Sequence, residues 1–79
     1  MARFFFDTTD GETFIRDDEG LEFGGIEQAR DEATRALAGM ARDAIPGKLR
    51  RELAVEVSDF LRRPLLRASV WFEVKVLAA

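Results

Sequence analysis

One segment with helical periodicity lies between segments with strand periodicity, and this arrangement restricts the fold more than any other feature. Apolar residues recur at intervals of three and four between residues 26 and 44: Ile26, Ala29, Ala33, Ala36, Leu37, Met40, Ala41 and Ala44. This spacing predicts an amphipathic helix, which Pro46-Gly47 ends after Ile45. Gly39 lies inside the helix at a cost of about 1 kcal/mol, so we expect a bulky neighbour packed tightly against it.

Four alternating segments predict strands on either side of this helix. Residues 3–7 and 12–16 form a hairpin around the turn Asp10-Gly11, and residues 53–58 and 66–76 form a second pair. The acidic, glycine-rich residues 17–25 predict a loop with a brief extended piece at 21–23. The fold class is therefore α+β in the order ββαββ, a four-stranded antiparallel sheet with one amphipathic helix packed on one face. At this length we expect one domain, 1–79.

Consecutive phenylalanines in the first strand place rings on both faces of the sheet. One helix covers one face, and the alternation assigns that face to Val55 and Val57. The other face would display Trp71, Phe14 and either Phe5 or its two phenylalanine neighbours. We take Phe5, Phe14 and Trp71 as the candidate interface, because exposed apolar patches on small proteins mark partner surfaces. The alternative is that the loop around Phe23 and the C-terminal residues 77–79 cover these rings.

The small size of the chain also favours association. A core of this size supplies about 3 to 5 kcal/mol of net stability unless disulfides, metals or oligomerisation add to it. The sequence has neither cysteine nor histidine. We therefore expect a homodimer, formed through the open face or the free edge of the long last strand, with a protein partner as a further binder.

The residue types present exclude several kinds of chemistry. Without histidine, cysteine or tyrosine, the chain cannot build a triad with an imidazole base or a common zinc site. Carboxylates cluster in Asp7-x-x-Asp10-Gly11 and Asp17-Asp18-Glu19-Gly20, but turns favour aspartate followed by glycine. We read both clusters as turns, and expect no catalytic residue, metal or cofactor.

Charge is segregated along the chain. Residues 1–32 carry ten acids and three arginines, whereas residues 33–79 carry nine bases and five acids, within a net charge of −3. One interpretation is a basic patch for nucleic acid at Arg50, Arg51, Arg62, Arg63 and Arg67. The acidic total favours complementarity within the chain or between subunits instead. Whether these arginines form one patch stays open, because they flank both ends of the third strand.

No apolar run is long enough to span a membrane. Acidic residues at Asp7, Asp10 and Glu12 interrupt the stretch where a signal peptide would need apolar residues. We therefore expect a cytoplasmic protein.

Several segments of the chain together resemble one family. They are the strand Arg3–Asp7, the turn Asp10-Gly11, the segment Asp17–Gly20, the helix pairs Glu32-Ala33 and Met40-Ala41, and the strand Ala54–Asp59. It is a family of short alphaproteobacterial proteins of unknown function, with the pattern R-[YF]-F-F-D, D-G, D-x-E-G and A-V-E-V-x-D. The resemblance covers nearly the whole chain and implies the fold, but no catalytic residue. It departs at Arg62, where the family tends to place the glycine of Asp-x-x-Gly-Arg-Pro.

Together these observations predict a small, non-catalytic, self-associating protein-interaction module of a bacterial cytoplasm. The alternative is an antitoxin of the HicB type or another regulator linked to nucleic acid. That alternative rests on similar size and architecture, which do not establish function.

Overall fold

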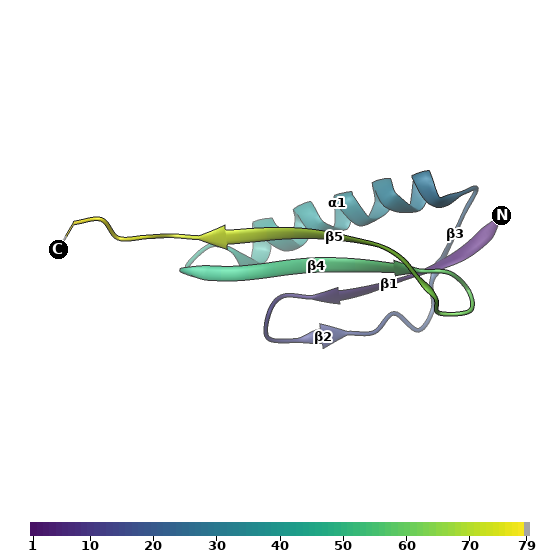
Figure 1. Cartoon of the computed structure of the whole chain (residues 1–79), viewed down its shortest axis with the longest axis horizontal. Helices are drawn as coiled ribbons and strands as arrows, with labels where there is room; N and C mark the ends of the chain where they lie inside the picture. Colours follow the sequence, from purple (N-terminus) through teal and green to yellow (C-terminus); the bar gives the residue numbers. More distant parts are fainter. Residues whose placement is uncertain (79) are drawn as a thin grey trace.

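The computed structural model describes residues 1–78 as one helix packed on an open antiparallel sheet (Figure 1). In chain order the elements are β1 (Ala2–Thr9), β2 (Phe14–Ile15), β3 (Leu21–Phe23), α1 (Ile26–Ala44), β4 (Arg50–Ser58) and β5 (Pro64–Glu73). The α+β class and the single helix on one face are confirmed. Of the chain the structure describes, no helix has the length and apolar character to cross a membrane.

The sheet has five strands rather than the predicted four. Its main path is β2-β1-β4-β5, and β3 pairs with the first half of β1, with Ala2 opposite Phe23 and Phe4 opposite Leu21. The order is therefore βββαββ, and the predicted ββαββ is wrong in this respect. The extra strand forms because the side chain of Asp17 binds the backbone N–H groups of Glu19 and Gly20, which turns the chain back along β1.

The core lies between α1 and the central strands. Ala29 and Ala33 are fully buried on the inner face of α1, against the fully buried Leu53, Val55 and Val57 of β4. Alanines on that face let the helix axis approach the sheet closely. Because β4 is central, its apolar row is covered by α1 and flanked by strands on both edges.

The three consecutive phenylalanines divide between the two faces. Phe4 is buried in the core, and Phe6 packs beside it on the same face. Phe23 of β3 adds a third ring, with its centroid 6.5 Å from that of Phe4 and 6.0 Å from that of Phe6. Phe5 therefore points to the opposite face, which settles the choice that the sequence left open.

The last strand is shorter than the alternating pattern predicts. β5 ends at Glu73 rather than at residue 76, although the N–H of Val74 still donates to the carbonyl of Leu49 at 2.7 Å. Beyond that bond the chain extends away from the sheet, and Val76 and Leu77 are 80% and 93% exposed. This extension contributes to a long axis of 55 Å against 20 and 17 Å for the others (Figure 1). Pairing stops because β4 begins only at Arg50 and offers no further strand.

The structure contradicts the tight contact expected at Gly39. A Cβ atom there would meet only the Nη2 of Arg42, at 3.9 Å, so the site has room for a methyl group. We predict that Gly39→Ala raises the free energy of unfolding by about 1 kcal/mol, which moves the Tm up by about 4 to 8 °C. The reciprocal variant Ala38→Gly, at an exposed position of the same helical turn, should lower the free energy of unfolding by a similar amount. Thermal unfolding of both variants tests this, and a lower Tm for Gly39→Ala would contradict it.

Candidate interaction surface

Within residues 1–78, the sheet face opposite α1 is covered by neither a helix nor a strand. Phe5, Thr9, Ala54, Ser69 and Trp71 point to this side, because they alternate with the residues that face the helix. We call it the open face. Trp71 is 62% exposed and Phe14 is 66% exposed, values that are unusual for rings on a strand of a folded domain.

Small residues separate the two exposed rings. Phe14 lies opposite Thr9, Thr9 opposite Ala54, and Ala54 opposite Ser69, so these four form one row across the sheet. Trp71 lies two residues further along β5, opposite Glu52. Three strand spacings place the backbones of Phe14 and Ser69 about 14 Å apart. The open face is therefore a shallow surface of small side chains with an aromatic ring near each edge.

Phe5 does not join this surface as an exposed ring. It lies near the other end of the sheet, opposite Ser58, and is half-buried. The guanidinium carbon of Arg62 sits 4.3 Å from the centroid of its ring, an arrangement that also gives a cation–π attraction. The candidate interface residues thus share a face, but only Phe14 and Trp71 are free on it. The covering group is Arg62, rather than the Phe23 loop or the tail that the sequence suggested.

Arg62 takes this position because the turn between β4 and β5 is left-handed at that residue, with φ of 65°. The turn is held by Asp59, whose Oδ1 accepts the N–H groups of Leu61 and Arg63, both at 2.9 Å. A tight turn is therefore present here with arginine, at the position where the resemblance leads us to expect glycine. The strain at a non-glycine residue is offset by what its side chain reaches.

The side chain of Arg62 reaches an acidic cluster formed by Asp7 and Asp17. Its Nη2 lies 3.7 Å from Oδ1 of Asp7, and its Nη1 donates to the backbone carbonyl of Asp17 at 3.2 Å. Asp7 in turn accepts the N–H of Asp17 at 2.8 Å. The cluster joins β1, the loop before β3 and the turn before β5.

Asp17 is the centre of this cluster. Its carboxylate accepts the backbone N–H groups of Phe6 at 3.0 Å, Glu19 at 3.1 Å and Gly20 at 3.0 Å. Burial acts to raise the pKa of Asp17, but these backbone N–H groups and the Arg62 guanidinium together hold the pKa below its ordinary value. Sequence reasoning missed this network. The available signal was an aspartate with a glycine within the next three residues, as at Asp10, which binds the N–H groups of Glu12 and Thr13 in the same way.

Each of the five arginines of the candidate basic patch faces a carboxylate. The pairs are Arg50–Glu73 at 3.2 Å, Arg51–Glu12 at 2.6 Å, Arg62–Asp7 at 3.7 Å, Arg63–Asp59 at 2.8 Å and Arg67–Glu56 at 3.8 Å. Arg50 and Arg62 flank opposite ends of β4, whose length separates them by about 27 Å. The structure therefore places these arginines at two ends of the sheet, with Arg67 between, rather than together.

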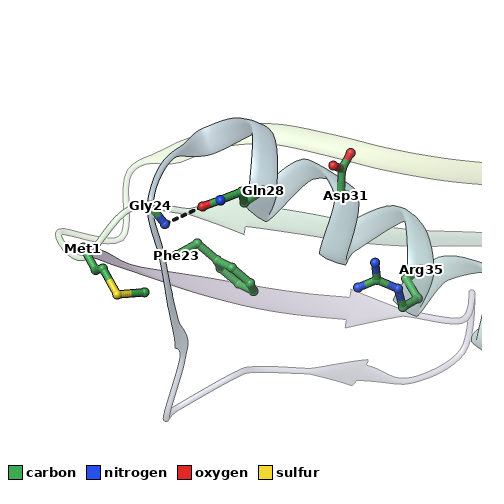
Figure 2. Close-up of a pocket in the computed structure, with 6 residues that line it drawn as sticks. All are labelled: Met1, Phe23, Gly24, Gln28, Asp31 and Arg35. Atoms are coloured by element: carbon green, nitrogen blue, oxygen red, sulfur yellow. Dashed lines mark hydrogen bonds between the residues drawn. The ribbon is translucent and has the colours of Figure 1, made fainter.

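A hollow of about 500 Å³ lies between the N-terminus and α1 (Figure 2). It is lined by Met1, Phe23, Gly24, Gln28, Asp31 and Arg35. Figure 2 shows the Gln28 amide turned toward the N–H of Gly24, which donates to its Oε1. The charged groups pair along the helix surface, Arg35 with Glu32 and Asp31 with Arg30. The hollow does not bring a nucleophile together with a base.

Residues 1–78 contain no group of three carboxylate, imidazole or thiol side chains placed to hold a metal ion. The acidic clusters serve turns instead. The N–H groups of Thr13 and Glu12 lower the pKa of Asp10, and those of Arg63 and Leu61 do the same for Asp59.

One of the comparisons with known proteins gives a match over most of the chain. Residues 3–71 match a protein family described as a domain of unknown function, DUF6894. The chain belongs to this family. The match to DUF6894 begins at Arg3 of β1 and ends at Trp71 of β5, so it spans the helix and reaches every strand. The alphaproteobacterial origin and the detailed motif stay predictions. No curated protein and no solved structure matches the chain.

Proposed function

We propose that this chain is a non-catalytic protein-interaction module of the cytoplasm that acts as a homodimer. The observation that carries the proposal is Trp71, a large apolar ring 62% exposed on β5, the edge strand of a sheet face that no helix covers. Burying the exposed part of this ring contributes up to about 3 kcal/mol per chain. That is comparable with the whole net stability expected of so small a core.

The open face supports association more than it supports chemistry. Its charged neighbours, among them Glu52 and Arg67, give the polar rim that surrounds an apolar centre in protein interfaces. Phe14, at the far edge of the same face, then provides a second aromatic anchor for a protein partner.

A regulator linked to nucleic acid, of the HicB type or otherwise, is the second candidate that the sequence raised. The five arginines on which it depends are each paired with a carboxylate and are spread along the length of β4, with Arg67 between the two ends. This arrangement favours the interaction module. A salt-dependent mobility shift of labelled duplex or RNA would favour the regulator.

We predict that Trp71→Asp weakens self-association at least ten-fold while the chain stays folded, because the charge replaces the apolar contact and repels its counterpart. Sedimentation equilibrium of the native chain and the variant measures the effect, with far-ultraviolet circular dichroism as the check on folding. Phe60→Asp is the matched control, since Phe60 is 66% exposed but lies in the turn between β4 and β5. Equal association constants for Trp71→Asp and the native chain would contradict the proposed surface.

A further inference from the structure

The outer edge of β5 carries unpaired backbone groups at defined positions. Among residues 1–78, β5 pairs only with β4. The bond from the N–H of Val74 to the carbonyl of Leu49 fixes which residues face β4. Since backbone groups alternate in direction along an antiparallel strand, the even-numbered residues of β5 bond to β4. Beyond the register shift at Ser58, the odd-numbered residues Arg67, Ser69, Trp71 and Glu73 direct their N–H and C=O groups outward.

We propose that this edge pairs with β5 of a second copy of the chain, antiparallel, around a two-fold axis at Val70. The inference rests on the proposed homodimer and names its geometry. A two-fold axis perpendicular to the sheet joins the two sheets edge to edge and keeps both helices on one face. Each exposed row of backbone donors and acceptors then finds partners in the other copy.

Charge selects this register over its neighbours. With the axis at Val70, Arg67 of each copy lies opposite Glu73 of the other, which gives two ion pairs across the axis. An axis at Ser69 places Lys75 opposite Arg63, and an axis at Trp71 places Arg67 opposite Lys75. Both of those registers set like charges face to face, whereas the Val70 register joins opposite ones. An axis at Ala68 would also set opposite charges together, Arg63 with Glu73, but Arg63 lies before the start of β5.

The ion pairs that Arg67 and Glu73 form within one chain do not prevent them from pairing with a second copy. Arg67 lies 3.8 Å from Glu56, and Glu73 lies 3.2 Å from Arg50 and 3.6 Å from Lys75. Arg50 and Lys75 are about 70% exposed or more at the side chain, so their pairs with Glu73 contribute little to the stability of the single chain. Both carboxylate and guanidinium can hold a second partner across the edge.

The same register accounts for the apolar residues that the single chain leaves half-covered. On the helix face, Leu66 would lie opposite Val74, and Ala68 opposite Phe72, a small residue against a large one. Leu66, Ala68 and Phe72 are each only half-buried in the single chain, and Val74 is 46% exposed. The tail beyond Glu73 gains a strand to pair with, since residue 76 falls opposite residue 64. The alternating pattern of residues 74–76 then has a structural role.

On the open face, Trp71 would lie opposite Ser69 of the second copy. The two tryptophans then stand diagonally across the axis, with Cα atoms about 7 to 8 Å apart. This places the most exposed ring of β5 at the centre of the dimer, consistent with the role proposed for it.

The test exchanges the charges of the facing pair. Arg67→Glu alone and Glu73→Arg alone should each raise the dimer dissociation constant at least ten-fold, because two attractive pairs become two repulsive ones. The two single variants mixed together, and the double variant alone, should both return to within about three-fold of the native constant. Arg50→Gln and Glu56→Gln are the controls, since they remove the partners within one chain and leave the facing pair intact.

A second measurement determines directly which residues of the two β5 strands lie opposite each other. The chain has no cysteine, so Val70→Cys introduces a single thiol that meets its own copy across the axis. Opposite residues at such a position have Cα atoms about 4.5 Å apart, within the range of a disulfide. We expect oxidation to give a covalent dimer in high yield for Val70→Cys. Val76→Cys should give little, because the two copies of that position would be separated by about 40 Å.

The outcomes separate this inference from the proposed function. A native chain that sediments as a monomer overturns both. A native dimer that is unaffected by the single charge reversals, or a mixture of the two that fails to recover, overturns the register while the homodimer stands. Efficient crosslinking of Val76→Cys but not Val70→Cys also overturns the register.

Discussion

Gly20→Ala is expected to lower the free energy of unfolding by about 3 kcal/mol. Gly20 has φ of 73°, a left-handed conformation that costs alanine about 1 to 2 kcal/mol. A Cβ atom would also lie 2.8 Å from the carbonyl oxygen of Phe4 and 3.0 Å from Cγ of Arg3. The oxygen belongs to the backbone of β1 and cannot move without disturbing the sheet. Because the whole domain is expected to have only about 3 to 5 kcal/mol, about 0 to 2 kcal/mol would remain, and urea denaturation should show the unfolding transition of the variant shifted to very low urea.

Gly47→Ala is the matched control for this prediction. Gly47 also has a positive φ, of 84°, but no atom lies within 4 Å of the position of its Cβ. It should therefore show only the conformational cost, about 1 kcal/mol. If both variants lose the same stability, the close approach of β1 to residue 20 does not contribute and the account of β3 is wrong.

Asp17→Asn is expected to lower the free energy of unfolding by about 2 kcal/mol at pH 7. The carboxylate accepts three backbone N–H groups, from Phe6, Glu19 and Gly20. An amide offers one oxygen in its place, and its NH₂ group turns a donor toward at least one N–H. Without these bonds the chain loses the turn that directs β3 back along β1. Asp18→Asn is the control, because the carboxylate of Asp18 forms an exposed ion pair with Arg16 and its loss should change stability by less than about 0.5 kcal/mol.

The effect of Asp17 should depend on pH. Since the folded state lowers the pKa of Asp17, its contribution is present above the ordinary aspartate pKa of about 4 and is lost as the pH falls through the lower folded value. The stabilities of the native chain and Asp17→Asn should therefore approach each other as the pH falls below the ordinary aspartate pKa and through the lower folded value. The folded state also lowers the pKa of Asp10 and Asp59, but it does so in the native chain and in the variant alike, so these two residues do not contribute to the stability difference. A stability difference that stays constant from pH 7 to pH 2.5 would contradict the role of the charged carboxylate.

The elements with long, regular patterns were predictable from the sequence. The helix at residues 26–44 and the alternation of β4 follow directly from apolar spacing, and both occur as expected. The sequence also predicts the extended piece at residues 21–23, but not its pairing with β1 as a strand of the sheet, because these residues lie in an acidic, glycine-rich segment. The formation of β3 depends on Asp17 contacting the backbone of Phe6, eleven positions away. Local pattern carries no information about such a contact.

The candidate surface was predictable to a similar degree. Strand alternation placed Phe14 and Trp71 on the face away from the helix, and both are exposed there. It could not show that Arg62 would cover Phe5, because that depends on a left-handed turn at a non-glycine residue. Nor could it show that small residues separate the two exposed rings, since that depends on the register between β1, β4 and β5.

The central claim is that a second copy of the chain pairs with this one and buries part of the apolar surface that one helix leaves open, above all Trp71. Sedimentation equilibrium of the native chain at tens of micromolar tests it most directly. We expect the measured mass to be twice the chain mass of 8.9 kDa, falling toward that value on dilution. A mass of 8.9 kDa at every concentration would contradict the claim.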